Sequence, residues 1–372
     1  MSWEKVKLID CCVSIADGDH QPPPKSETGI PFVTIANIVN NQFDFTNSMF
    51  VPNYYYEKLD SKRKAQKGDI LYSVVGSFGI PVFIKDNKPF VFQRHIAILR
   101  PNGNIDARFL YYTMLSRDFY MKADAAAIGA AQRTVSLTAL RNIEITVPSI
   151  ETQRRIADIV SAYDDLIENN RKQIKLLEEA AQRLYKEWFV DLHFPGHEHT
   201  KIMDGVPEGW RSGILDNIVS ETGKATQKEN RQNYDYYLPI DCLPKKSIGY
   251  VDTNDIELAE SSLVSFDKGD IIFGAMRPYF HKVVVARNKG LTRSTCFVLN
   301  SRSENMWGYV AMLLFDSATV EYATQISVGT TMPYVRWKDM KLMPVLIPTN
   351  QIAASFNVLI KPEINKIGLL AN

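Results

Sequence analysis

Three histidines in one short segment could bind a metal ion. His193, His197 and His199 lie close together, but no cysteine or carboxylate joins them at the spacing of a zinc site. The Gly and Pro residues around them are more typical of a solvated linker, so we predict no metal here. The Asp-Gly-Asp-His sequence at residues 17–20 could supply an acid and a base, although Asp and Gly are also the usual residues of a loop turn.

Motifs of catalytic and cofactor-binding sites are absent from the sequence. There is no Gly-x-Gly-x-x-Gly after a strand-like run, no phosphate-binding loop and no His-Glu-x-x-His. The chain also lacks an Asn-Pro-Pro-aromatic tetrapeptide and a glycine-rich loop for a methyl donor. We therefore expect no cofactor and no catalytic activity.

A set of basic, amide, hydroxyl and aromatic residues remains, in loops bounded by glycine. Such side chains bond base edges and phosphates. In the first half of the chain they are Lys62, Arg63, Lys64, Ser77, Gln93, Arg94, Gln132 and Arg133. In the second half they are Lys245, Lys246, Arg277, Tyr279, His281, Arg293, Thr331 and Arg336. Each one taken singly is more often an ordinary solvated residue, but the similar placement in both halves favours a nucleic-acid surface.

This similar placement follows from an internal repeat with an offset close to 200 residues. The repeated pairs are KGDILY and KGDIIF (67–72 and 268–273), GAAQRTV and GTTMPYV (129–135 and 329–335), ITVP and VLIP (145–148 and 345–348), and Trp-x4-Leu at 3–8 and 210–215. Four ordered pairs at one offset indicate a tandem duplication. Each half contains strand-like and helix-like runs, which predicts two similar domains of the α+β class.

A long helix is predicted between the two domains. Residues 151–191 contain no Gly or Pro, and apolar residues recur at steps of four and three, which is a heptad pattern. The pattern spans roughly 50 Å at 1.5 Å per residue. An ordinary core helix is the alternative, but a coiled-coil spacer fits the narrow apolar face better. Asn170 on this seam either fixes the register or is a tolerated polar position.

We expect domains at 1–148 and 210–348, a spacer helix at 149–192, a linker at 193–209 and a short second helix at 349–372. Two similar halves predict an approximate two-fold molecule whose two helices form an antiparallel coiled coil. The second helix is short, so we expect part of the first seam to lie beyond its reach. That part would contact a partner protein, another copy of the chain or the linker, and comprises Leu177, Leu184, Tyr185, Trp188 and Phe189.

Composition and charge constrain the function of the chain less than its motifs do. Lys+Arg 43 and Asp+Glu 42 leave a formal charge of +1, so any nucleic-acid surface must arise from local clustering. No run approaches eighteen apolar residues, and the N-terminus has no apolar signal core. The four cysteines lack zinc spacing, which favours a reducing cytoplasm.

Several of these stretches together resemble the specificity subunits of type I restriction-modification systems. The most specific are AAQRLYKEWFVD at residues 180–191 and VPEGW at 206–210, supported by GDIL at 68–71 and by Val147-Pro148 followed by Gln153 and Ile156. The resemblance covers the whole chain, although members of the family usually have a longer second helix.

The resemblance implies a non-catalytic subunit without a cofactor. Each domain would read one half of a bipartite double-stranded DNA target, and the coiled coil would set the gap. Two methyltransferase (modification) subunits would dock on the helices, and restriction (translocase/nuclease) subunits would join the full complex. Self-association through an exposed seam is a further expectation. Two alternatives remain from the residues alone: a protein–protein scaffold without DNA binding, and an enzyme of unknown type with a deep pocket of convergent titratable groups.

Overall fold

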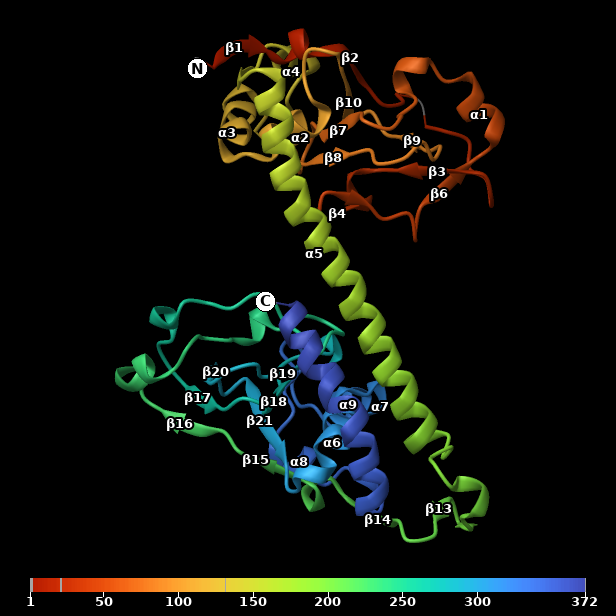
Figure 1. Cartoon of the computed structure of the whole chain (residues 1–372), viewed down its shortest axis with the longest axis vertical. Coiled ribbons are helices and arrows are strands. Elements are labelled where there is room, and N and C mark those ends of the chain that lie inside the picture. Colours follow the sequence, from red (N-terminus) through yellow and green to blue (C-terminus); the bar gives the residue numbers. More distant parts are fainter. Residues whose placement is uncertain (1–2, 21, 131, 372) are drawn as a thin grey trace. The chain divides into compact units, whose positions relative to one another are not determined.

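The computed structural model describes residues 3–20, 22–130 and 132–371; Met1, Ser2, Gln21, Ala131 and Asn372 lie outside the described residues. The chain divides into two compact units, Met1–Leu166 and Ile167–Asn372. One continuous helix, α5 (Ile150–Tyr185), belongs to the first unit in its first half and to the second unit in its second half (Figure 1).

A four-stranded antiparallel sheet forms the centre of the first unit. Its strand order is β2 (Cys12–Asp17), β10 (Ile96–Pro101), β7 (Ile70–Ser73) and β8 (Pro81–Phe83). Every residue of β7 is buried because the sheet is covered on both faces. Ile70 and Tyr72 pack on one face and Leu71 packs on the other, as the alternation of side chains along a strand requires.

Helices cover one face of this sheet and small strands cover the other. The helices are α2 (Ala107–Leu115), α3 (Arg117–Ala126) and α4 (Leu137–Arg141). The side chains of Asp106, Ser116 and Ser136 accept backbone N–H groups at their starts. The other elements are β3 (Ile30–Val33), β4 (Ile38–Val39), β5 (Gln42–Phe43), β6 (Met49–Val51), β9 (Val91–Phe92) and α1 (Asn53–Lys58). Strands β1 (Glu4–Lys7) and β11 (Glu144–Val147) pair with each other and bring the two ends of this region together.

The second unit repeats this plan. Its central antiparallel sheet has the order β15 (Val219–Glu221), β21 (Cys296–Ser301), β18 (Ile271–Gly274) and β19 (Val283–Val285), which matches the order in the first unit. Strands β14 (Arg211–Ile214) and β22 (Pro344–Ile347) correspond to the β1–β11 pair. The remaining strands are β12 (Ile202–Met203), β13 (Val206–Pro207), β16 (Lys224–Thr226), β17 (Leu263–Phe266) and β20 (Gly290–Arg293). The helices are α6 (Trp307–Phe315), α7 (Ser317–Gln325), α8 (Trp337–Met340) and α9 (Asn350–Leu370).

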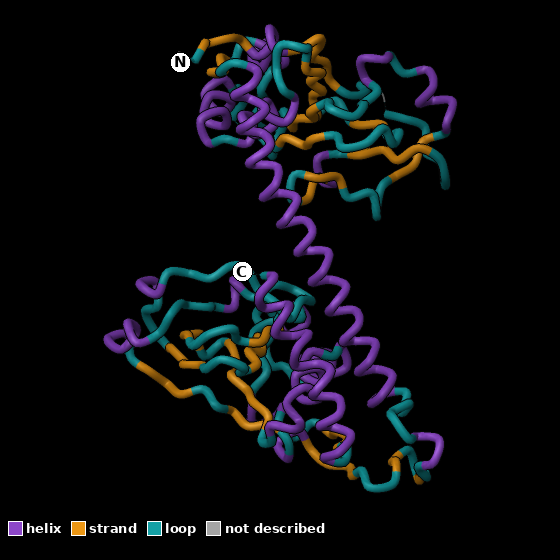
Figure 2. Tube along the Cα trace, viewed as in Figure 1, coloured by secondary structure: helices purple, strands orange, loops and turns teal. Residues whose placement is uncertain are grey.

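The second half of α5 runs antiparallel to α9 within this unit (Figure 2). Near the end of α5, the rings of Trp188 and Phe356 lie 5.5 Å apart. Farther back along α5, Ile174 lines the same cavity as Ala371, at the end of α9. Two similar mixed units and an antiparallel helix pair confirm the predicted fold class.

The antiparallel pairing also corrects the predicted partner-binding residues. It places the start of α9 beside the end of α5, so the end of the seam is covered and not left beyond reach. Tyr185, Trp188 and Phe189 are buried in the core of the second unit, and Leu177 and Leu184 pack partly buried against the same core. The ring centres of Phe189 and Trp210 lie 5.8 Å apart, and Trp210 is the first residue after the predicted linker.

Exposed apolar residues of α5 lie nearer its start. Tyr163 on the predicted seam is exposed by 67%, and Ile159 and Leu166, which lie off the seam, are exposed by 62% and 54%. Ala157 and Ile156 of this half of α5 pack in the apolar core of the first unit. Polar contacts with α2 lie beside them: Arg108 pairs with Asp158 at 2.7 Å, and the Tyr112 hydroxyl donates to Asp164 at 2.9 Å. These apolar side chains are therefore available for a partner helix.

Candidate nucleic-acid interface

Three loops meet at one end of the central sheet in the first unit. They are residues 74–79 after β7, residues 93–95 before β10 and the hairpin at 128–134. The Val74 N–H donates to the His95 carbonyl at 2.9 Å, and the Gly76 N–H donates to the Arg133 carbonyl at 3.0 Å. The backbone therefore fixes the three loops to one another, although they are far apart in the sequence.

The second unit has the same junction. The Ala275 N–H donates to the Thr295 carbonyl at 2.9 Å, and the Arg277 N–H donates to the Pro333 carbonyl at 2.7 Å. The pair of bridges between 328 and 334 and between 276 and 334 repeats the bridges that join 128 and 75 to 134. The duplication thus preserves a backbone frame and changes the side chains that it carries.

The loop after the central strand shows this change clearly. Gly76 in the first unit has a φ of 70°, a conformation that glycine adopts freely. Arg277 occupies the equivalent position with a φ of 50°, which costs a non-glycine residue about 1–2 kcal/mol. Strained residues of this kind concentrate at functional sites. The guanidinium of Arg277 is held in the junction, where it donates to the Thr331 carbonyl at 3.4 Å.

The junction of the first unit presents polar side chains to solvent. Ser77, Arg94 and Gln132 are exposed, and Gln93 is partly exposed. Arg133 is anchored more firmly, because its guanidinium pairs with Asp124 at 2.6 Å and lies over the ring of Phe78. The predicted residues of these three loops therefore do come together.

The basic triplet at 62–64 lies beside this junction. Arg63 pairs with Asp17 at 3.5 Å, at the end of β2. Two residues further on, the Asp19 carbonyl accepts the Arg94 N–H at 3.0 Å, which links this segment to the junction. Lys64 donates to the Glu57 carbonyl at 2.9 Å, while Lys62 is exposed. The His20 ring bonds Asp17 at 2.6 Å, so the Asp-Gly-Asp-His segment forms part of this loop network.

In the second unit, Tyr279, Arg293 and Thr331 are exposed around the equivalent junction. The two lysines at 245 and 246 join it from another loop. The Lys246 N–H donates to the His281 carbonyl at 2.8 Å, and the Lys245 ammonium lies 4.2 Å from the centre of the Phe280 ring. Lys245 and Lys246 are themselves exposed.

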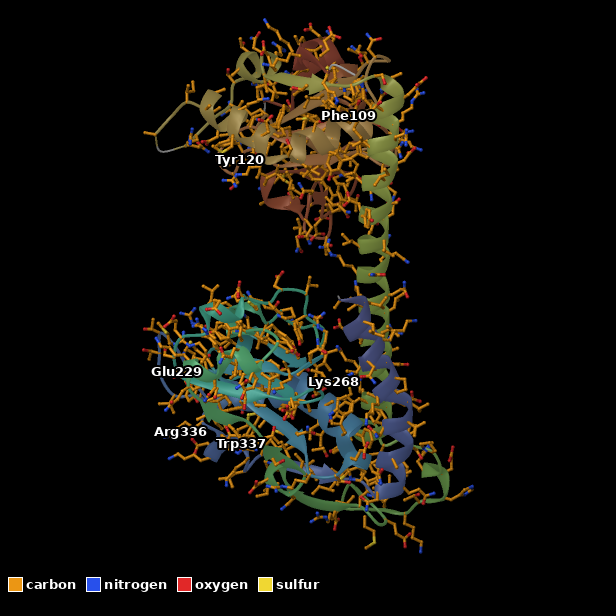
Figure 3. All side chains as sticks on the ribbon, turned by 60° about the vertical axis from the view of Figure 1, so that its left-hand side comes forward. Phe109, Tyr120, Glu229, Lys268, Arg336 and Trp337 are labelled. Atoms are coloured by element: carbon orange, nitrogen blue, oxygen red, sulfur yellow. The ribbon has the colours of Figure 1, made fainter. Side chains whose placement is uncertain are left out.

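Two predicted residues of the second unit are placed differently. His281 is buried, with its ring bonded to the Phe315 carbonyl at 2.8 Å and packed on the Phe315 ring. Burial also lowers the pKa of His281. Because its ring faces inward and is bonded within the unit, the structure contradicts the predicted DNA contact of this residue. Arg336 pairs with Asp339 at 2.6 Å at the start of α8, beside Trp337 and after the loops of the junction (Figure 3).

One residue at the first junction was not predicted. Tyr120 on α3 stacks on Phe78 at 5.8 Å and is partly exposed beside the junction (Figure 3). A β-carbon at Gly79 would lie 2.7 Å from the Tyr120 ring, so glycine at this position lets the ring approach. The sequence signal was therefore a glycine in the loop, which does not identify the aromatic residue that it accommodates.

A cavity of about 890 Å³ in the second unit is lined by Lys268, Trp307 and Lys361 among others, and its lining contains no histidine or cysteine. Lys361 pairs there with Glu304 at 3.2 Å. Within the described ranges, no three His, Cys, Asp or Glu side chains are grouped to hold a metal ion. No helix among these residues has the length and apolar character needed to cross a membrane.

Known proteins to which this chain is similar are subunits of type I restriction enzymes. The family described as "Type I restriction modification DNA specificity domain" matches residues 2–179. The type I restriction enzyme MjaIX specificity subunit of Methanocaldococcus jannaschii is 23% identical over 98% of this chain and 87% of its own length. The putative MjaX specificity subunit of the same organism is 31% identical over 58% of this chain and 52% of its own length.

Two further relatives extend the comparison. The type I restriction enzyme HindI specificity subunit of Haemophilus influenzae is 29% identical over 44% of this chain and 36% of its length. Among solved structures, the S subunit of a type I restriction-modification system from M. genitalium has a TM-score of 0.64 at 15% identity. It matches 99% of this chain and 91% of that one, and at this identity the likeness concerns the fold.

Proposed function

We propose that the chain is a specificity subunit of a type I restriction-modification system and that its two units read the two halves of a split double-stranded DNA target. Such a subunit recognises DNA and is not itself the enzyme. The observation that supports two separate reading sites is the junction of three loops, which has the same backbone frame in both units and different side chains in each. The recognition domains would comprise residues 1–148 and 210–348.

Residues 149–192 would form the spacer helix and residues 349–372 its short partner, with the linker at 193–209. This helix pair would set the gap between the two halves of the target. Two methyltransferase subunits would dock on the helices, and the exposed Ile159, Tyr163 and Leu166 fit the apolar face that a partner helix requires. The same face would serve for self-association. Restriction subunits would complete the assembly, and chromosomal DNA as the ligand would place it in the cytoplasm.

The proposal is tested by methylome sequencing of cells that carry this chain with its methyltransferase partner. We expect a methylated sequence with two defined parts and an undefined gap. Cells with the methyltransferase but without this chain should lack methylation at that sequence. A protein–protein scaffold without DNA contacts predicts the same methylome with and without the chain, and that result would refute the proposal.

The basic triplet at 62–64 is expected to contact phosphates. Replacing Lys62, Arg63 and Lys64 by glutamine should weaken binding to all duplexes about equally. The slope of log K against log salt concentration is negative, and its magnitude should fall by about 3, because each lost phosphate contact reduces it by about 1. Fluorescence anisotropy with a labelled duplex at several salt concentrations measures both effects.

The matched control replaces Lys5, Lys7 and Arg155, which are exposed on β1 and α5, and removes the same charge. This control should leave the slope unchanged. If the triplet variant bound only one target sequence more weakly, the three residues would contact base edges and not phosphates. If both triple variants weakened binding equally, the effect would come from the net charge of the protein and not from the position of the triplet.

A further inference from the structure

Glu178 is a buried carboxylate on α5. Its side chain is only 9% exposed, on the face of the helix that packs into the second unit. One oxygen, Oε1, accepts hydrogen bonds from the Ser247 hydroxyl at 2.6 Å, the Ile248 N–H at 2.8 Å and the Gly249 N–H at 3.5 Å. Three donors from consecutive residues therefore converge on one atom of the spacer helix.

This arrangement is unusual for a residue beside an apolar seam. Burying a carboxylate is unfavourable unless donors compensate for the lost water, and all the donors named above are neutral. Burial raises the pKa of Glu178, while its three hydrogen bonds act in the opposite direction. The adjacent Glu179 shows the ordinary alternative, because it is partly exposed and lies 3.9 Å from Lys175 on the helix surface. The burial of Glu178 thus serves to hold residues 247–249.

The segment held by Glu178 continues directly into the candidate interface. Lys245 and Lys246 precede it, and the Lys246 N–H donates to the His281 carbonyl. On the other side, the Ile248 carbonyl accepts the Val285 N–H at 3.1 Å, at the end of β19. Hydrogen bonds at both ends and the backbone of residues 246–248 between them therefore connect the spacer helix to the loop at 277–281.

The first unit attaches to α5 in a different way. The side chain of Gln153 accepts the Asp106 N–H at 2.9 Å, and Asp158 and Asp164 bond Arg108 and Tyr112. These contacts hold α2 and Asp106, the residue that caps its start. By contrast, the hydrogen bonds of Glu178 reach a loop that adjoins a candidate interface.

We propose that Glu178 is a positioning residue for DNA recognition: from the spacer helix, it holds the basic loops of the second unit in the orientation that reads its half of the target. This inference rests on the proposed function. It predicts that the sequence preference of one half-site depends on a residue that lies in neither recognition domain and that need not touch DNA.

The test uses the full chain assembled with its methyltransferase subunits and a library of duplexes with a random core. Bound duplexes are sequenced for the wild type and for Glu178→Ala, Glu178→Gln and Glu179→Ala. Glutamine retains a carbonyl oxygen as the acceptor, and Glu179→Ala removes a neighbouring carboxylate that does not hold the loop. The half read by the second unit is identified as the half that persists when residues 1–148 are exchanged.

For Glu178→Ala we expect enrichment of the second unit's half to fall about tenfold, the effect of one mismatched base pair. Enrichment of the other half should stay within about twofold of its wild-type value. For Glu178→Gln and Glu179→Ala, enrichment of both halves should stay within the same limit. Hydrogen exchange on the same complexes should show faster exchange at Ile248 and across 277–281 in Glu178→Ala alone.

Each other outcome is decisive. Unchanged enrichment of both halves in Glu178→Ala, or an equal loss in both halves, overturns the positioning role, since an equal loss indicates general destabilisation. Failure of Glu178→Gln to restore the preference also overturns it. A wild-type complex that enriches no split sequence contradicts the proposed function itself, and so the two failures are distinguishable.

Discussion

Replacing Phe356 by alanine is expected to destabilise the second unit by about 3–5 kcal/mol, the usual effect of truncating a buried phenylalanine. Phe356 is completely buried at the start of α9. Its ring lies 4.8 Å from that of Phe189 and 5.5 Å from that of Trp188, both in the π-helical segment Lys186–Val190 that directly follows α5. Loss of the ring would open a cavity between the two helices, in a core that also includes α6.

Urea unfolding followed by tryptophan fluorescence measures this effect. Trp188, Trp210, Trp307 and Trp337 all lie in the second unit, so the signal reports mainly on it. The control is Val358→Ala on the same helix, because Val358 is 72% exposed and its truncation should change stability by less than about 0.5 kcal/mol. A Phe356→Ala variant within about 1 kcal/mol of the wild type would contradict the helix pairing described above.

The repeat in the sequence predicted the shared fold because the repeated residues have local structural roles. Gly68 and Gly269 have φ values of 92° and 88°, which a tight turn before the central strand requires. The aspartate that follows each glycine accepts a backbone N–H three residues earlier, from Gln66 in one unit and Asp267 in the other. The Lys-Gly-Asp motif is therefore a turn that starts β7 and β18, and its recurrence indicates a common backbone.

The surroundings of the two aspartates differ, and the repeat did not predict this. Asp69 forms an ion pair with Arg100 at 2.8 Å. Asp270 instead accepts hydrogen bonds from the Asn300 amide at 2.7 Å and the Thr222 hydroxyl at 3.2 Å. Burial raises the pKa of Asp270. Pairwise contacts of this kind depend on residues far apart in the sequence, which a repeat of short motifs does not specify.

The heptad pattern predicted a long helix but not the part of it that is covered. Apolar spacing indicates which face of a helix packs, whereas the position of its partner depends on chain direction and on where the next domain folds. The end of the seam, with Tyr185 and Trp188, is covered because α9 begins beside it and Tyr309 of α6 also packs there. The exposed residues of the seam are instead Tyr163 and Ile167.

The candidate interface was predicted in part for a similar reason. Loop residues of the right chemical type were brought together because glycine-bounded loops at equivalent places in a repeat share one backbone frame. His281 was predicted wrongly because residue type does not indicate which way a side chain points, and its ring turns inward to the Phe315 carbonyl. Glu178 was not singled out, since a charged residue beside an apolar seam ordinarily faces solvent.

Exchanging residues 1–148 for the first domain of another specificity subunit is expected to replace one half of the methylated sequence completely. The other half should stay the same, and so should the gap, because the spacer helix is unchanged. The exchange is structurally feasible because β1 pairs with β11, with Glu4 opposite Val147, and so the two ends of the region lie together before α5 begins at Ile150. Methylome sequencing of cells carrying the exchanged chain and the same methyltransferase measures all three features.

The design must preserve the contacts between this region and the first half of α5. Arg108 pairs with Asp158, and Tyr112 bonds Asp164, so a donor domain that lacks these partners would attach poorly to the helix. A second exchange that extends to residue 166 and brings the donor's own helix residues controls for this. Both exchanges should yield the same new half-site. If either one altered the half read by the second unit, recognition would not be divided between two independent domains, because the junctions at 274–281 and 329–335 are untouched in both chains.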